Sequence, residues 1–161
     1  MKNKVYIASD HAGYELKNTV KIYVESLGYE VIDSGPFHFD AQDDYPDFIT
    51  PCAQSVATDW ANDCTTSMGI ILGGSGQGEA MCANRVKGAR AGVYYGGQGK
   101  QTDASGKVID MIASLREHNN ANILSLGARF IDEAEMKTAI QSFLSLPFSH
   151  DPRHERRINK F

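Results

Sequence analysis

Residues 68–79, MGIILGGSGQGE, decide the fold of this 161-residue chain. The segment opens on an apolar run, 68–72, which predicts a strand buried on both faces, as in a parallel sheet. Glycines at 73, 74, 76 and 78 follow, and a run of glycines leaves backbone N–H groups that a ligand can approach closely. Glu79 stands where the next helix would begin, so a possible base faces a possible anion-binding loop.

Strand and helix patterns alternate on both sides of this segment. The sequence predicts five strands, at 5–8, 29–32, 68–72, 90–95 and 122–126. It predicts helices at 12–27, 47–61, 78–86 and 108–115, and a last amphipathic helix that Asp132 would cap. In the second helix, Pro51 confines the reliable part to the residues beyond it. The alternation predicts a three-layer α/β fold of Rossmann- or flavodoxin-like type, an open parallel five-stranded sheet with helices on both faces.

Size and composition fit a single domain spanning 1–161. No apolar run approaches the roughly 20 residues of a membrane span, so we expect no membrane insertion. The net charge of −4 argues against general nucleic-acid binding. Cys52, Cys64 and Cys82 lack CxxC spacing, which indicates neither a disulfide scaffold nor a zinc site. Because no secretory segment precedes the first strand either, a cytoplasmic location fits best.

Candidate functional residues follow three of the predicted strands. Asp10 and His11 come after the first strand, the glycine loop 73–79 after the third, and Arg129 after the fifth. Because ligands bind at the carboxyl ends of the strands in open parallel sheets, we expect these groups to meet at one edge. A carboxylate such as Asp10 can orient an imidazole or exchange a proton with a hydroxyl group. A histidine after a strand can also be an ordinary loop residue bonded to backbone, and for His11 alone that alternative stays open.

The glycine loop admits more than one interpretation. A dinucleotide fingerprint is disfavoured, because Glu79 replaces the third glycine and a carboxylate would repel a pyrophosphate. One remaining interpretation is a tight turn in which Glu79 favours the start of a helix. The other is an oxyanion cradle for an enediolate, with Glu79 as general base. Burial would raise the pKa of Glu79 and nearby N–H groups would lower it, so the sequence does not give the direction.

Six motifs in one order, spread over nearly the whole chain, carry a resemblance to a known family. They are SDHAGYELK at 9–17, DDYP at 43–46, GGSGQGE at 73–79, AN at 83–84, REHNN at 116–120 and RHERR at 153–157. In these motifs the chain resembles the ribose-5-phosphate isomerase B family, which includes galactose-6-phosphate and allose-6-phosphate isomerases. That family takes its base either from a cysteine at the start of the glycine loop or from a glutamate at its end. Gly73 and Glu79 make this chain similar to the glutamate type, with Cys82 a buried helix residue.

The resemblance implies a metal-free aldose–ketose isomerase that needs no cofactor and acts on a small sugar phosphate. The expected reaction interconverts ribose 5-phosphate and ribulose 5-phosphate. Glu79 would move a proton between C2 and C1 through a cis-enediolate, Asp10 would assist ring opening, and His11 would lie near the phosphate. The enediolate oxygens would be stabilised by the Ser75 hydroxyl and by backbone N–H groups of Gly74, Gly76, Gln77 and Gly78. An isomerase of six-carbon sugar phosphates and a non-catalytic sugar-phosphate sensor remain alternatives.

Arg129 and two arginines near the carboxyl terminus are the phosphate candidates. Arg153 and Arg157 are four residues apart, so on a helix they would share a face. The planar guanidinium fork suits phosphate oxygens, although a solvated basic terminus is the alternative from the residues alone. The resemblance favours phosphate binding, with Tyr45 as a further contact.

His118 precedes the fifth strand, so it should lie at the amino end of the sheet, away from the glycine loop of its own subunit. Alone, it is typical of a surface or helix C-terminal residue. The resemblance implies instead a homodimer or dimer of dimers with an active site shared between subunits. There His118 would open the sugar ring and Asn119 would bind a hydroxyl. The chain departs from the family in a longer connection at 96–106, which would act as a lid, alter sugar preference or be a neutral insertion. It also has a shorter carboxyl terminus, which leaves the strength of subunit packing open.

Overall fold

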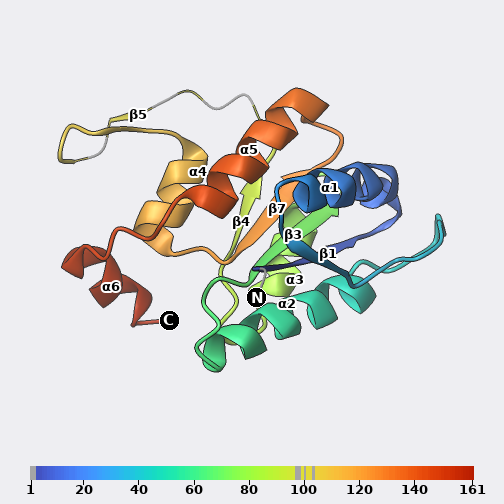
Figure 1. Cartoon of the computed structure of the whole chain (residues 1–161), viewed down its shortest axis with the longest axis horizontal. Coiled ribbons are helices and arrows are strands. Elements are labelled where there is room, and N and C mark those ends of the chain that lie inside the picture. Colours follow the sequence, from blue (N-terminus) through green and yellow to red (C-terminus); the bar gives the residue numbers. More distant parts are fainter. Residues whose placement is uncertain (1–2, 97–98, 100, 103) are drawn as a thin grey trace.

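A five-stranded parallel sheet forms the centre of the molecule (Figure 1). The computed structural model describes residues 3–96, 99, 101–102 and 104–161. The strands of the sheet are β1 (Lys4–Ser9), β2 (Glu30–Asp33), β3 (Met68–Gly73), β4 (Ala91–Tyr94) and β7 (Ile123–Gly127). They lie in the order β2-β1-β3-β7-β4, and every pairing is parallel. The predicted α/β fold is therefore confirmed.

Helices cover both faces of the sheet, and each face has its own apolar core. One face carries α1 (Tyr14–Ser26), the short α4 (Met111–Ala113) and α5 (Glu133–Ser145). The other carries α2 (Pro46–Ala61) and α3 (Gln77–Ala83) (Figure 1). Every residue of β3 and β7 is buried, because strands that are covered on both faces have no side that meets water.

The strand order places a topological switch point between β1 and β3. The chain leaves β1 toward β2 on one side and returns to β3 on the other, so the loops after β1 and β3 diverge at the carboxyl edge. The register pairs Ser9 with Leu72 and Gly73 with Gly127, which sets the ends of three strands side by side. Open α/β sheets bind ligands at such a point. A 3-10 turn, η1 (His11–Gly13), follows β1 there and leads into α1.

The helix predicted at 108–115 is wrong in its first part. Val108–Ile109 form β6, which pairs antiparallel with β5 (Gln101–Thr102) in a separate two-stranded sheet. The helix begins only at Met111, because the side chain of Asp110 accepts a hydrogen bond from the Ala113 N–H (2.8 Å) and caps it. A π-helical turn, η2 (Ser114–His118), then extends this helix toward β7.

Two prolines mark helices that the sequence pattern described incompletely. Pro51 lies inside α2, and the residues before it are helical as well. The expectation that only the residues beyond Pro51 form a reliable helix is therefore wrong. Pro152 opens a last helix, α6 (Pro152–Ile158), which the sequence pattern did not place as an element. Asp151 caps α6 by accepting a hydrogen bond from the Arg153 N–H (2.9 Å), so the Asp-Pro pair is the local signal for this helix.

The connection at 96–106 carries β5, whose partner β6 follows it, while residues 97–98, 100 and 103 lie outside the described residues. The expectation of a lid or a neutral insertion therefore stays a prediction. Over the part of the chain that the structure describes, none of the helices combines the length and apolar character that crossing a bilayer requires.

Candidate active site

The carboxyl ends of three neighbouring strands bring Asp10, the glycine loop 73–79 and Arg129 together. The Asp10 N–H donates to the Leu72 carbonyl (3.3 Å), which ties the end of β1 to that of β3. The Arg129 N–H donates to the Gly74 carbonyl (3.1 Å), which ties the end of β7 to the same loop. The three candidate segments that follow the strands therefore lie at one edge of the sheet, as the strand pattern predicted.

Glycines in the loop stand where a side chain would collide with candidate site residues. A β-carbon at Gly73 would lie 2.0 Å from the Glu79 carboxyl group, and one at Gly74 would lie 3.1 Å from Arg129 Nη1. Gly76 has φ of +74°, a left-handed conformation that side chains rarely adopt. A tight turn alone would require only Gly76. The first two glycines leave room for a carboxylate and a guanidinium, which favours the interpretation as a ligand site.

Glu79 is buried in the first turn of α3, with 4% of its surface exposed. Burial is the largest effect on its carboxyl group and raises its pKa. A hydrogen bond from its own backbone N–H and the charge of His11 lower the pKa, while the charge of Asp10 raises it. The net direction is upward, which answers the question the sequence left open. A carboxyl group shifted in this way is a better proton acceptor near neutral pH than an exposed one.

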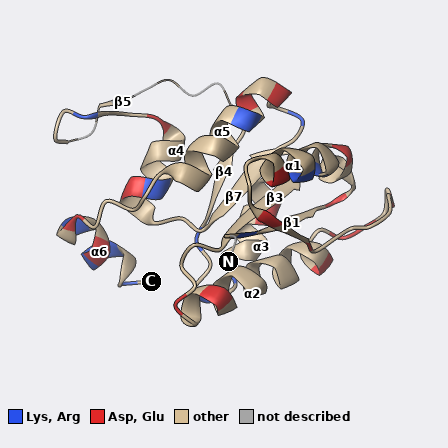
Figure 2. Ribbon diagram, in the orientation of Figure 1, with Lys and Arg blue, Asp and Glu red and all other residues tan. Residues whose placement is uncertain are grey.

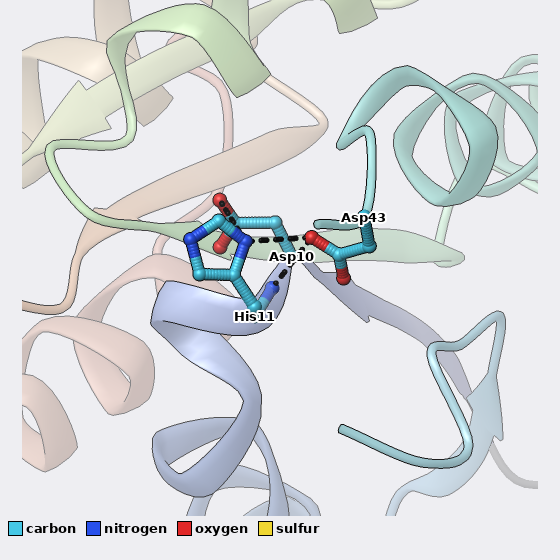
Figure 3. Close-up of side chains that lie close together, drawn as sticks. All are labelled: Asp10, His11 and Asp43. Atoms are coloured by element: carbon cyan, nitrogen blue, oxygen red, sulfur yellow. Dashed lines mark hydrogen bonds and ion pairs between the residues drawn. The ribbon is translucent and has the colours of Figure 1, made fainter. Parts of the chain in front are cut away.

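Asp10, His11 and a third residue, Asp43, form a cluster beside the glycine loop, in which His11 is hydrogen-bonded to Asp43 (Figure 3). Asp10 is buried, and its Oδ1 accepts a hydrogen bond from the Gly13 N–H (3.0 Å), which caps η1. Asp43 Oδ1 lies 2.7 Å from His11 Nδ1 and also accepts a hydrogen bond from the His11 backbone N–H (3.1 Å). Asp10 Oδ2 lies farther from the same ring nitrogen, at 3.9 Å.

The electrostatic surroundings raise the pKa of His11. The hydrogen bond to Asp43 is the largest cause, partial burial of the ring opposes it, and the charges of Asp10 and Asp43 add to the rise. Arg129 lowers the pKa of His11, which means that this guanidinium is close enough for its charge to be felt at the ring. His11 is therefore a cation over a wider pH range than a free histidine.

Asp10, His11 and Asp43 could in principle offer ligand atoms to a metal ion, since one donor atom from each lies within 4.8 Å of the others. His11 Nδ1 and Asp43 Oδ1, however, are engaged with each other at 2.7 Å. A metal would have to displace the proton between them. The arrangement is that of a charge-assisted hydrogen bond rather than of an open set of metal ligands.

Side-chain contacts hold the middle of the glycine loop in place. The Ser75 hydroxyl accepts a long hydrogen bond from the Gln77 N–H (3.4 Å). The buried hydroxyl of Ser125, on β7, donates to the Gly76 carbonyl (2.6 Å). The loop therefore has a fixed shape before any ligand arrives, which is what stabilising a developing charge requires.

Tyr45 borders the loop from the start of α2. A β-carbon at Gly78 would lie 3.1 Å from the Tyr45 hydroxyl oxygen, and the tyrosine is 37% exposed, so its hydroxyl is available at the rim of the site. Cys82, expected to be buried, is only half-buried on α3, with its Sγ 3.3 Å from Thr50 Oγ1.

His118 lies at the opposite end of the sheet, where η2 leads into the start of β7, as the sequence order predicted. Its ring stacks on that of His154, with the ring centroids 4.3 Å apart and the planes 14° apart. Asn119 follows and is exposed, with its Nδ2 donating to the Ser114 carbonyl (3.0 Å). The fold of a single chain therefore does not bring His118 or Asn119 to the glycine loop.

Arg153 and Arg157 lie on α6, which is also found at this far end (Figure 1). Arg153 Nε lies 3.1 Å from Asp151 Oδ2, while Arg157 is exposed. Basic and acidic residues are interleaved along α6 (Figure 2). Burial lowers the pKa of His154, and the nearby charges of His118 and the two arginines lower it further. His154 thus lies beside His118, Arg153 and Arg157, away from Glu79 and Arg129, and the charge of Asp151 opposes the lowering of its pKa.

A cavity of about 430 Å³ also lies at this end of the molecule. Asn119, Arg90 and Phe161 are among the residues that line it, and no residue of the glycine loop does. Titratable groups with shifted pKa cluster at the switch point between β1 and β3, and such groups indicate an active site better than the size of a cavity does.

Sequence reasoning missed Asp43, Ser125 and His154 as parts of these clusters. Asp43 and His154 lie within the motifs 43–46 and 153–157, so position inside a motif was a usable signal. Ser125 had none, because a serine within an apolar strand gives no indication of the carbonyl that its hydroxyl will meet.

Comparison with known proteins identifies a family over nearly the whole chain. Residues 5–161 match the family model described as Ribose/Galactose Isomerase. Ribose-5-phosphate isomerase B of Mycolicibacterium paratuberculosis is 39% identical over 156 residues, which cover 97% of this chain and 87% of that protein. The protein of the same name from Mycobacterium tuberculosis is 38% identical over 97% of this chain and 86% of its own length.

Solved structures agree with this assignment. Ribose-5-phosphate isomerase B from Mycoplasma genitalium with bound ribulose 5-phosphate has a TM-score of 0.83 and 35% identity, covering 99% of this chain and 94% of its own. A ribose 5-phosphate isomerase from Thermotoga maritima has a TM-score of 0.79 and 39% identity, covering 98% and 96%.

Proposed function

This chain belongs to the ribose/galactose isomerase family, and we propose from that premise that it interconverts ribose 5-phosphate and ribulose 5-phosphate. The observation that carries the proposal is the buried Glu79 carboxyl group, which fills the space above Gly73 beside Asp10. Relatives that carry the name ribose-5-phosphate isomerase B support the choice of sugar.

The chemical step is a proton transfer. The Glu79 carboxylate takes the proton from C2 of the open-chain aldose; the C–H electron pair forms the C1–C2 double bond, and the carbonyl pair moves onto O1. A proton then passes from the C2 hydroxyl to O1, and Glu79 returns its proton to C1, which leaves a ketone at C2. The backbone N–H groups of the loop and the Ser75 hydroxyl stabilise the enediolate oxygens. Because fixed dipoles carry this charge, the scheme requires neither a metal nor a cofactor.

The phosphate lies toward Arg129 and His11 in this proposal. Arg129 borders Gly74 at the carboxyl edge, and the raised pKa of His11 favours its positively charged form at the same edge. A guanidinium fork and an imidazolium are well matched to a phosphate dianion. Tyr45, at the rim beside Gly78, is a further contact for the phosphate. Binding energy from the phosphate then orients C1 and C2 against Glu79.

The site is completed by a second copy of the chain. His118, Asn119, Arg153 and Arg157 lie at the amino end of the sheet, where they cannot serve their own glycine loop. In a homodimer, or a dimer of dimers, His118 of the partner subunit assists ring opening together with Asp10. Asn119 of the partner subunit binds a hydroxyl, and the partner's Arg153 and the partner's Arg157 add to phosphate binding. The position of these residues opposite the loop supports this arrangement.

A six-carbon sugar phosphate is the second candidate substrate. The matching family is described by both ribose and galactose, so the same chemistry on a longer sugar fits the family as well. The distance between Glu79 and the phosphate-binding cations would decide between the two. A sugar-phosphate sensor without turnover would need the phosphate-binding cations and the glycine loop, but it would not need a buried Glu79. The buried Glu79 therefore favours an enzyme over a sensor.

The test is turnover by the purified protein with EDTA present, with ribose 5-phosphate, allose 6-phosphate and galactose 6-phosphate assayed in parallel. We expect the pentose phosphate to be converted with the highest kcat/KM, undiminished by the chelator. Turnover of a hexose phosphate alone would correct the substrate and keep the mechanism. Binding without turnover of any of the three would replace the enzyme by a sensor.

A further inference from the structure

Among the residues that the structure describes, the buried carboxylate of Asp43 forms hydrogen bonds only with His11. Its side chain is 6% exposed. Its Oδ1 is hydrogen-bonded both to the ring Nδ1 and to the backbone N–H of His11. Oδ2 is buried and has no hydrogen-bond partner among the residues that the structure describes. Burying a carboxylate is unfavourable unless a partner compensates, so the interaction with His11 must offset most of that penalty.

The contact is more than a tether between two loops. A tether would be complete with the bond from the His11 backbone N–H to Asp43 Oδ1 (3.1 Å). The second bond, from Nδ1 to the same oxygen, is the shorter one at 2.7 Å and fixes the plane of the ring. Nε2 is then the free nitrogen, with no hydrogen bond from any described residue, on the side of the ring away from Asp43 (Figure 3).

We propose that Asp43 is a positioning residue, which holds His11 with its proton on Nδ1 and presents Nε2 to the phosphate group of the substrate. This inference rests on the proposed function for the identity of the substrate, but not for the state of the ring. An acceptor on one imidazole nitrogen sets the tautomer and leaves the other nitrogen for its ligand. When the ring is protonated, Nε2–H becomes a charged donor aimed away from Asp43, suited to a phosphate oxygen.

The charged groups around the ring act together on its protonation. Asp10 approaches from the end of β1, Asp43 from the loop before α2, and Arg129 from the loop after β7. Glu79, on α3, also interacts electrostatically with His11. Of these, Asp43 is in direct hydrogen-bond contact with the ring, and it is the largest cause of the raised pKa. Removing the charge of Asp43 should therefore lower the pKa of His11, so that the ring loses its proton at a lower pH than in wild type.

The first test is nitrogen-15 NMR of His11 in the free protein, for wild type, Asp43→Asn and Asp43→Ala, with His11→Asn used to assign the signals. We expect wild type to show the Nδ1–H tautomer when neutral. Asp43→Asn should keep that tautomer, because its amide oxygen can still accept the bond, but with a lowered pKa. Asp43→Ala should lose both properties. An Nε2–H tautomer in wild type, or an unchanged pKa in Asp43→Asn, would overturn the proposal.

The matched control is Asp44→Asn, which removes the same charge from an exposed neighbouring position. It should leave the tautomer and the pKa of His11 as in wild type. Circular dichroism reports whether each variant folds, and if Asp43→Ala does not, Asp43→Asn decides alone. A structural tether would lower the melting temperature of Asp43→Asn without moving the pKa of His11.

The second test is affinity for inorganic phosphate, followed at the His11 nitrogens, together with steady-state kinetics on ribose 5-phosphate. We expect Asp43→Asn to weaken phosphate binding and to raise KM by roughly 10-fold, the scale of one weakened charge-assisted hydrogen bond. The value of kcat should change far less, because His11 lies at the phosphate rather than at C1 and C2. Equal affinity of wild type and Asp43→Asn for inorganic phosphate would contradict the proposal. If no sugar phosphate is turned over but the NMR and phosphate results hold, the proposed function fails and the role of Asp43 stands.

Discussion

Gly73 and Glu79 occupy one space at the end of β3. A β-carbon at position 73 would lie 2.0 Å from the carboxyl group, so a side chain there and the present position of Glu79 exclude each other. We expect Gly73→Ala to push the carboxylate out of place and to lower kcat on ribose 5-phosphate by roughly 10²-fold, the scale of a misplacement of about 1 Å. Steady-state kinetics measures this.

The matched control is Gly99→Ala, since a β-carbon at Gly99 meets no atom of the described residues within 4 Å. That variant should keep the wild-type kcat. A Gly73→Ala protein as active as wild type would show that Glu79 need not occupy the space above residue 73.

The raised pKa of Glu79 makes a prediction about stability. The folded state holds this proton more tightly than the unfolded chain, so the contribution of Glu79 to stability falls as pH rises from about 4.5 through the raised folded value. Glu79→Gln removes the titration. The free energy of unfolding of both proteins is measured in urea between pH 4 and pH 8. The value for Glu79→Gln should rise relative to that of wild type across this window, and the difference should then stay constant at higher pH. A difference between the two proteins that is constant with pH would contradict the shift.

Sequence reasoning at the residue scale identified groups that follow strands, but not the partners that orient them. Glu79, Asp10 and Arg129 could be placed at one edge because strand order in a parallel sheet fixes where each strand ends. The bond between Asp43 and His11 joins residues 32 positions apart through a loop of irregular structure. No periodicity in the sequence encodes the path of such a loop, so this contact arises only when the chain is folded.

At the scale of elements, apolar pattern predicted every strand of the central sheet to within two residues at each end. It failed at 108–109, where two β-branched residues were assigned to a helix although Asp110 starts the helix after them. The cap, a local chemical signal, was more reliable there than the apolar pattern. The same kind of signal, Asp151-Pro152, marks α6.

The cap of α5 offers a test of this point. The Asp132 side chain accepts a hydrogen bond from the Glu135 N–H (2.8 Å), as the sequence predicted. Asp132→Ala should lower the free energy of unfolding by about 1 kcal/mol, measured in urea. Asp132→Asn keeps a capping oxygen and should stay close to wild type. Equal losses in the two variants would mean that the charge, rather than the cap, stabilises the helix.

At the scale of the whole molecule, the residues proposed for the site lie at both ends of the sheet. The resemblance to the isomerase family, drawn from motifs in one order, is confirmed by the family match over residues 5–161. The assembly is not encoded in any local pattern, because a subunit interface depends on surfaces that meet only in a second copy. The shared site therefore stays a prediction.

A mixing experiment tests the shared site. Glu79→Gln and His118→Ala should each be nearly inactive, but subunits exchanged between them would form mixed dimers with one intact site. Random pairing makes about half of the dimers mixed, so roughly a quarter of the wild-type activity should return. Glu79→Gln and Gly73→Ala both alter the carboxyl end of the sheet, so a mixture of these two variants should regain no activity. Failure of the first mixture to regain activity, with exchange verified by mass spectrometry, would place each site within one chain.

The most direct measurement is turnover of ribose 5-phosphate by Glu79→Gln, with binding of the sugar phosphate measured on the same preparation by calorimetry. If Glu79 is the base, kcat falls at least ~10²-fold, the lower scale for a general base, while the sugar phosphate still binds. A variant that binds the sugar phosphate and turns it over at the wild-type rate would show that another group moves the proton.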